Sequence, residues 1–256
     1  MRVWDLRLIR AELSKLGLDW DAPPLPPAKA DDPAPLQVEL DTADLAMTAE
    51  GRNAYWQRQV ALDSFRLTLQ PLDAPAALRR GRAYARLGKA ARAVDDFTLA
   101  LALIPPPVRD SLDGIPASEV AFQLNNWAWG WALKPPPEGD GRKALFAAQK
   151  AVELGPTTWT YWNTLGVVQY RLGQYPQARE SLERSLQGSE GEAAAFDLFF
   201  LAMCHHHLGD AVKARACYDQ AVRWVEENRK TLPPNWAKEL QDFHKEAAAQ
   251  LGIAAP

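Results

Sequence analysis

One spacing of small residues recurs along this chain and limits the folds open to it. A glycine or alanine is followed twelve positions later by an alanine, and seven residues after that by another small residue. A small side chain at a helix contact lets two axes approach to about 8–10 Å, where a large one would clash. Because each copy spans two helix-like stretches, the spacing predicts antiparallel helical hairpins. The crossing positions in the first helices are Gly81, Ala128, Gly166 and Ala202.

Glycines mark the turns inside these predicted hairpins. Gly88, Gly173 and Gly209 each lie between the two helical stretches of a copy, and glycine readily adopts the left-handed conformation that ends a helix. The second copy differs, because sixteen residues rather than twelve separate Ala128 from Ala144. We interpret its proline- and glycine-rich segment, residues 134–141, as an enlarged connecting loop.

The repeated positions resemble tetratricopeptide repeats, which are helical hairpins of roughly 34 residues. The third copy shows the pattern at Trp162, Leu165, Gly166, Gly173 and Ala178. The resemblance implies an all-α fold: a right-handed superhelical array of antiparallel helical hairpins, or tetratricopeptide-like α-solenoid, with a C-terminal capping helix. It also implies a non-catalytic scaffold that binds a protein or peptide.

Composition divides the chain into five parts. Residues 1–20 are similar to a WD-type strand followed by a short amphipathic helix, and residues 21–37 are a proline-rich linker. We expect an edge helix or half repeat in residues 38–73 and about four hairpins in residues 74–230. Residues 233–252 are apolar on one face and charged on the other, as expected of a capping helix.

Several longer sequence segments indicate which group of tetratricopeptide repeat proteins the chain resembles. LNNWAW (124–129), AVELGP (151–156) and YWNTLGV (161–167) look like the repeat tail of large bacterial proteins that join a eukaryotic-like serine/threonine kinase or a WD-repeat propeller to such repeats. VWDLRLIR (3–10) is similar to the end of that propeller. The resemblance implies an alternative role, as the regulatory C-terminal segment of a larger protein whose catalytic part lies upstream. The sequence itself has no kinase glycine-rich loop, His-Arg-Asp or Asp-Phe-Gly motif.

Charge and cysteine content argue against several classes of partner. The net charge of −3 gives no overall attraction to phosphate backbones, so we do not expect nucleic acid binding. Cys204 and Cys217 lack the spacing of a zinc site or a secreted disulfide framework. No apolar run approaches the roughly 18 residues that span a bilayer. We therefore expect a cytoplasmic protein with no membrane partner and no cofactor, and the sequence leaves its oligomeric state open.

No motif predicts catalysis or metal binding. Three histidines follow Cys204, but neighbours on a helix point about 100° apart and do not converge on one ion. A group of arginines around the first repeat has two interpretations, a solvated helix face or an anion site, and the solvated face is the more common in proteins. These arginines are Arg79, Arg80, Arg82, Arg86 and Arg92.

We expect a partner to bind the first helix of each hairpin. In tetratricopeptide families the concave surface comes from this helix, at positions that share one face. Arginine forks would hold a carboxylate there, and Trp129 or Tyr170 would anchor a peptide. The alternative, that some of these side chains pack against the next repeat, stays open. The predicted groove residues are Arg82, Arg86, Asn125, Trp129, Asn163, Tyr170, Arg171 and His206.

Overall fold

A computed structural model describes residues 49–104, 111–112, 114–135 and 141–253 of the chain, and most of them are helical. The predicted WD-type strand, the short helix after it and the proline-rich linker lie outside the described residues. Contacts between Cα atoms group the chain into Met1–Ala46 and Met47–Pro256. The description below concerns the second unit.

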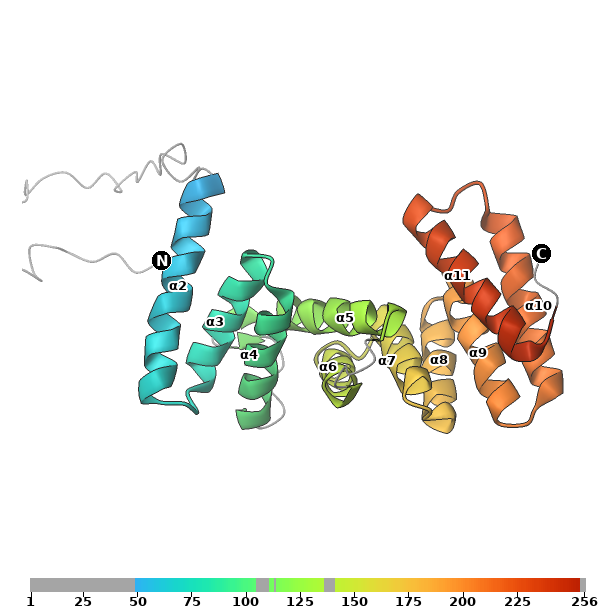
Figure 1. Cartoon of the computed structure of the whole chain (residues 1–256), viewed down its shortest axis with the longest axis horizontal. Coiled ribbons are helices and arrows are strands. Elements are labelled where there is room, and N and C mark those ends of the chain that lie inside the picture. Colours follow the sequence, from blue (N-terminus) through green and yellow to red (C-terminus); the bar gives the residue numbers. More distant parts are fainter. Residues whose placement is uncertain (1–48, 105–110, 113, 136–140, 254–256) are drawn as a thin grey trace, which may run out of the picture. The chain divides into compact units, whose positions relative to one another are not determined.

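The described residues contain ten helices, which follow one another in sequence order along the unit (Figure 1). A first helix, α2, is followed by four helical hairpins and a last helix, α11. The two helices of each hairpin pack on each other, and α6 on α7 and α8 on α9 join one hairpin to the next. The bounds are α2 Ala49–Leu69, α3 Ala74–Arg86, α4 Ala90–Leu103, α5 Ala117–Leu133, α6 Gly141–Leu154, α7 Trp159–Arg171, α8 Tyr175–Gly188, α9 Ala194–His207, α10 Ala211–Asn228 and α11 Pro234–Leu251.

Small residues lie where the helices of a hairpin cross, as the spacing predicts. A Cβ atom added to Gly81 would come within 2.8 Å of the Phe97 ring on α4. One added to Gly166 would come within 2.6 Å of Cγ of Leu182 on α8. Ala128 is fully buried. The two close approaches leave no room for a larger side chain, so the predicted crossings at Gly81 and Gly166 are confirmed.

The three predicted turn glycines end the first helices of their hairpins. Gly88, Gly173 and Gly209 have φ angles of 70°, 73° and 82°, in the left-handed region. The residue after each glycine donates its backbone N–H to a carbonyl five residues earlier, as in Lys89 to Tyr84 at 2.8 Å. This bond satisfies a carbonyl that the helix end would leave without a partner.

A small antiparallel pairing precedes the second hairpin. Strand β1 (Ser111–Leu112) pairs with β2 (Ile115–Pro116), and Leu112 lies opposite Ile115. Both of these side chains are almost fully buried. The pairing therefore anchors the connection to the core just before α5 begins at Ala117.

The last helix, α11, closes the array by packing mainly on α9 and more lightly on α10. Its apolar face buries Leu240, Phe243, Ala247 and Ala248. The structure thus confirms an all-α fold of antiparallel hairpins with a C-terminal capping helix. None of the helices in the described part of the chain is long and apolar enough to cross a bilayer.

Candidate functional site

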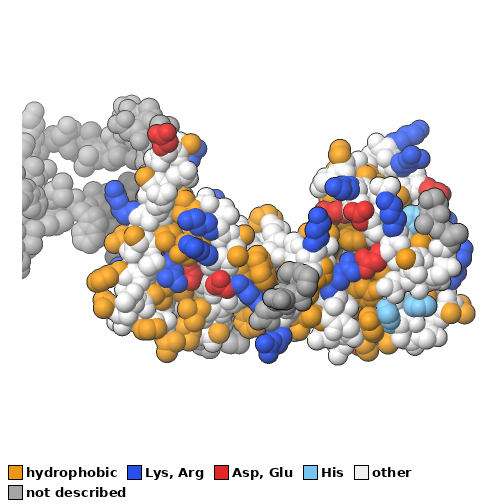
Figure 2. Space-filling model, in the orientation of Figure 1, with side chains coloured by type: hydrophobic (Ala, Val, Ile, Leu, Met, Phe, Trp, Pro, Cys, Tyr) orange, Lys and Arg blue, Asp and Glu red, His pale blue; other side chains and the backbone are white. Residues whose placement is uncertain are grey.

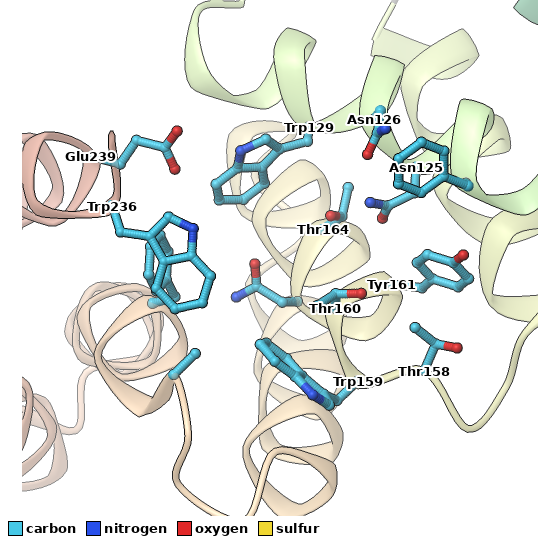
Figure 3. A pocket seen from close by; sticks show the side chains of 14 residues that line it. Asn125, Asn126, Trp129, Thr158, Trp159, Thr160, Tyr161, Thr164, Trp236 and Glu239 are labelled. Carbon is cyan, nitrogen blue, oxygen red and sulfur yellow. The ribbon is translucent and has the colours of Figure 1, made fainter. Parts of the chain in front are cut away.

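A pocket lies where the first helices of three hairpins meet the last helix. Its walls come from α5, α7, α9 and α11, and its volume is about 540 Å³ (Figure 3). The pocket is rich in aromatic and uncharged polar side chains. Its lining residues are Phe122, Asn125, Asn126, Trp129, Thr158, Trp159, Thr160, Tyr161, Asn163, Thr164, Ala193, Phe196, Trp236 and Glu239.

The lining residues follow one register on successive helices. Phe122, Thr160 and Phe196 each lie six residues before the crossing residue of their own helix. Asn125 and Asn163 each lie three residues before it. Positions three or four residues apart share a helix face. The pocket is therefore built mainly from the N-terminal halves of the first helices.

The two asparagines at equivalent positions differ in their hydrogen bonds. Nδ2 of Asn163 donates to Oδ1 of Asp197 at 2.8 Å. In contrast, the buried Oδ1 of Asn125 has no donor within the described structure. An unpaired buried acceptor costs roughly 1–3 kcal/mol. Asn125 therefore lies in the pocket wall with a side-chain oxygen that accepts no hydrogen bond from the described residues.

Asp197 does not line the pocket, but it holds the lining residue Asn163 in place. Its carboxyl group on α9 is fully buried and accepts hydrogen bonds from Asn163 on α7 and, at 3.0 Å, from Oγ of Ser185 on α8. Burial raises the pKa of Asp197 to about 7, because the two hydrogen bonds only partly offset the desolvation of the charged form. This carboxyl group fixes the position of Asn163 by linking three helices.

Aromatic rings and one carboxylate form the end of the pocket next to α11. The Phe196 and Trp236 rings meet edge to face at 5.2 Å, and Trp129 lies 6.4 Å from Phe196. Glu239 is the only charged side chain among the described residues that line the pocket. Burial raises the pKa of Glu239, while a hydrogen bond with Trp129 acts in the opposite direction. Figure 3 shows Trp129, Trp236 and Glu239 at the same end.

Tyr170 and Arg171 do not line the pocket. Tyr170 is 6% exposed, and its hydroxyl group donates to Sδ of Met203 at 3.4 Å. Arg171 donates to the carbonyl oxygen of Ala132 at 3.0 Å and to both carboxylate oxygens of Glu246 on α11. The last helix thus engages the C-terminal end of α7, where the polar atoms of these two side chains already have partners inside the chain. Their predicted contact with a partner stays a prediction.

Arg82 and Arg86 lie on the first hairpin and also do not line the pocket. Both pair with Glu119 of α5, at 3.2 Å and 3.0 Å. A carboxylate from a partner would therefore have to compete with Glu119. Charges of both signs are interspersed on the face shown in Figure 2, rather than separated into patches.

The solvated-face interpretation is wrong for Arg80. This side chain donates two hydrogen bonds to Asp96, at 2.8 Å and 2.7 Å, and Asp96 is 4% exposed. The hydrogen bond to Asp96 raises the pKa of Arg80. Sequence spacing did not reveal this pair, because Asp96 lies on the second helix of the hairpin and the pairing depends on how the two helices pack.

His206 is exposed near the C-terminal end of α9, outside the pocket. Its neighbour His207 stacks on Tyr175, with ring centroids 4.1 Å apart. Across the residues that the structure describes, no three His, Cys, Asp or Glu side chains are grouped in a way that could hold a metal ion.

The structure brings together three of the predicted groove residues, Asn125, Trp129 and Asn163, at one pocket. The prediction missed Phe122, Thr160 and Phe196, which lie six residues before the crossing residues of α5, α7 and α9, although positions six and three residues before a crossing share a helix face. Asn126 and Thr164, the residues directly after Asn125 and Asn163, were missed as well. It also missed Trp236 and Glu239, because no repeat spacing relates the last helix to the hairpins. The apolar face of that helix was visible in the sequence, but its neighbours were not.

A comparison with protein families agrees with the helical-hairpin fold. A model of the tetratricopeptide repeat family matches residues 138–195. No curated protein sequence matches the chain. Similar solved structures include the crystal structure of MamA, which is 16% identical over 67% of this chain and 89% of that chain, with a TM-score of 0.45. Another is the TPR2AB domain of yeast Sti1 in a complex with pHSP90, 11% identical over 80% of this chain and 87% of that chain, with a TM-score of 0.41.

The crossing residues, the left-handed turn glycines and the family match define the class of fold. The described unit is a tetratricopeptide-like array of helical hairpins closed by a C-terminal helix. Such arrays generally serve as binding surfaces, because each repeat exposes one face of its first helix along the stack.

Proposed function

We propose that this protein is a non-catalytic scaffold that binds an extended peptide segment of a partner protein in the pocket between α5, α7, α9 and α11. The observation that carries the proposal is the chemistry of the pocket walls. Aromatic rings offer large contact area at low entropic cost, and amide and hydroxyl groups suit the polar groups of a peptide backbone. The unpaired Oδ1 of Asn125 needs a donor such as a backbone N–H.

The rigidity of the walls supports binding to a largely preformed site. Asn163 is held by Asp197, and Phe196 packs against both Trp129 and Trp236. Side chains held by packing and hydrogen bonds lose little freedom on binding, which leaves more of the interaction energy for affinity. A flexible peptide would instead change its own conformation to fit the walls of the pocket.

A blocking substitution tests this function. Thr160 lies on the pocket wall and is half-buried, so Thr160→Arg would place a long side chain in the pocket. Thr231→Arg is the matched control, because Thr231 is exposed after α10 and does not line the pocket. Peptides are selected from a displayed random dodecapeptide library on the unmodified protein, then synthesised and titrated against both variants.

We expect the selected peptides to bind the Thr231→Arg variant normally and the Thr160→Arg variant at least about tenfold more weakly. Circular dichroism of both variants checks that the helices are intact. Equal binding to the two variants, or a library with no enriched peptide, would contradict the proposal.

The narrower prediction of a WD-repeat or serine/threonine kinase parent rests on the sequence phrases alone. We also propose that the protein is cytoplasmic and that it binds neither nucleic acid nor a membrane. Reading the DNA in frame upstream of Met1 tests the parent protein directly, because further WD-type blades or a kinase domain would be visible there.

A further inference from the structure

The charge at the pocket is opposite to the one that the groove arginines suggested. Arg82, Arg86 and Arg171 are each paired with a glutamate of this chain. The pocket itself has a carboxylate, Glu239, as the only charged group among its described lining residues. The electrostatics of the pocket therefore favour a cation over an anion.

Glu239 has no positively charged partner among the described residues. Its side chain is half-buried on α11, and no lysine, arginine or histidine of the described residues forms an ion pair with it within 4.0 Å. Its hydrogen bond comes from the neutral indole of Trp129. A partly buried carboxylate without a cation bears a desolvation penalty, which a bound cation would offset.

The tryptophans beside Glu239 provide surfaces that attract cations. A guanidinium or ammonium group within about 6 Å of a ring centroid is drawn to the face of the indole. Elsewhere in this chain Arg184 lies over Trp162 at 4.7 Å and Lys143 lies over Trp127 at 4.8 Å. Within the described part of the chain, no cation of the protein occupies Trp129 or Trp236 in this way.

We propose that this end of the pocket holds the side chain of a lysine or arginine in the bound peptide, with its charged head beside Glu239 and its stem along Trp129 and Trp236. Long basic side chains pack their methylene groups on apolar surface while the head stays with a polar partner. The inference rests on the proposed function, because it names the residue class that the peptide site selects.

The test uses the full chain and synthetic dodecapeptide pools with one fixed central residue. The fixed residue is lysine, its uncharged analogue norleucine, or glutamate, and the other positions are an equal mixture of glycine, alanine, serine and threonine. Binding is followed by the indole N–H signals in two-dimensional NMR, with those of Trp129 and Trp236 assigned through single phenylalanine substitutions. Titration of each pool then reports both affinity and location.

We expect the lysine pool to bind at least about fivefold more tightly than the norleucine pool and to shift the Trp129 and Trp236 signals. The preference should weaken as salt is raised. It should be lost in Glu239→Gln, which keeps the shape of the side chain and its acceptor for Trp129. Asp242→Asn is the matched control, because Asp242 is exposed on the same helix and does not line the pocket.

Each other outcome overturns a distinct part of the proposal. Equal affinity of the lysine and norleucine pools with both tryptophan signals shifted would leave peptide binding intact and refute the cation site. Tightest binding by the glutamate pool would do the same. If spermidine alone shifted the two signals at concentrations as low as the lysine pool, the ligand would be a free polyamine rather than a peptide. If no pool shifted either signal, peptide binding at this pocket and the cation site would both be wrong.

Discussion

The first hairpin and the pocket region share the same helical-hairpin scaffold, but they differ in whether their polar side chains have partners within the chain. Around α3, arginines pair with acids on neighbouring helices, as Arg80 does with Asp96 and Arg82 with Glu119. Around the pocket, Asn125 has an unused acceptor and Glu239 has no ionic partner among the described residues. The comparison teaches that equivalent helices can close a surface with ion pairs or keep it available for a ligand.

Equivalent positions show where the difference lies. One residue after the crossing position, α3 has Arg82 and α5 has Trp129. Three residues before it, α3 has the fully buried Leu78, whereas α5 has Asn125 in the pocket wall. The backbone pattern is shared, so the contrast comes from side-chain identity and not from the fold.

The largest expected effect is loss of the buried ion pair in the first hairpin. Asp96→Asn should lower the free energy of unfolding by about 3 kcal/mol, because the mostly buried Arg80 guanidinium would lose its charged partner. Urea denaturation followed by circular dichroism measures the change. Asp95→Asn is the control, since Asp95 is exposed and its pair with Lys143 lies at the surface; we expect no more than about 0.5 kcal/mol there. Equal effects of the two substitutions would contradict the view that buried charge pairs close this region.

The pocket region should instead respond to pH through Asp197. The pKa of this carboxyl group is raised to about 7 in the folded protein, above the usual value of about 3.9 in an unfolded chain. The folded state therefore binds the proton more tightly, so this contribution is full below about pH 4 and is lost as the pH rises through 7. From pH 5.5 to pH 8 the loss amounts to roughly 2 kcal/mol.

Comparison with Asp197→Asn isolates this contribution. The asparagine cannot ionise, yet it can still accept from Asn163 and donate to Ser185, so the variant should lose less stability than the unmodified protein between pH 5.5 and pH 8. Burial lowers the pKa values of His205, His207 and His244, which contribute with the opposite sign in both proteins and cancel in the difference. The measurement is the urea midpoint at each pH. Parallel pH profiles for the two proteins would show that Asp197 does not titrate in this range.

The fold could be predicted from the sequence because local spacing determines it. Gly81 and Gly166 have room for no side chain, and Gly88 and Gly173 have positive φ angles, so the sequence shows both features directly. The pocket could be predicted only in part. Asn125, Trp129 and Asn163 follow the repeat register, and the structure places all three at the pocket.

The remaining site residues depend on contacts that no spacing encodes. Glu239 and Trp236 reach the pocket because α11 folds back onto α9, far from α5 in sequence. Glu246 on the same helix forms an ion pair with Arg171. The repeat pattern had assigned Arg171 to a partner surface. A capping helix both adds residues to the site and occupies positions that the hairpins alone would expose.

The shared scaffold predicts equal sensitivity of the two regions at their crossing glycines. Gly81→Ala and Gly166→Ala should each destabilise the protein by up to about 2 kcal/mol, since crowding costs about 1–3 kcal/mol and the gain in helix propensity offsets about 1 kcal/mol of it. Gly130→Ala is the control: Gly130 lies on α5 with open space around it, so the substitution should stabilise by up to about 1 kcal/mol. Thermal unfolding gives all three values. Tolerance of alanine at only one crossing would mean that the two regions do not share one packing scheme.

The smallest expected effect contrasts the two glutamates directly. Glu119→Gln should destabilise by about 0.5 kcal/mol, because Glu119 pairs with both Arg82 and Arg86 at a partly exposed site. Glu239→Gln should leave stability unchanged or slightly higher, because it removes a partly buried charge that has no ionic partner among the described residues and keeps an acceptor for Trp129. Urea midpoints measured in parallel resolve the two signs. A loss of stability in Glu239→Gln as large as that in Glu119→Gln would mean that Glu239 stabilises the fold. The proposed distinction between a surface closed by ion pairs and a surface that remains open to a ligand would then be wrong for Glu239.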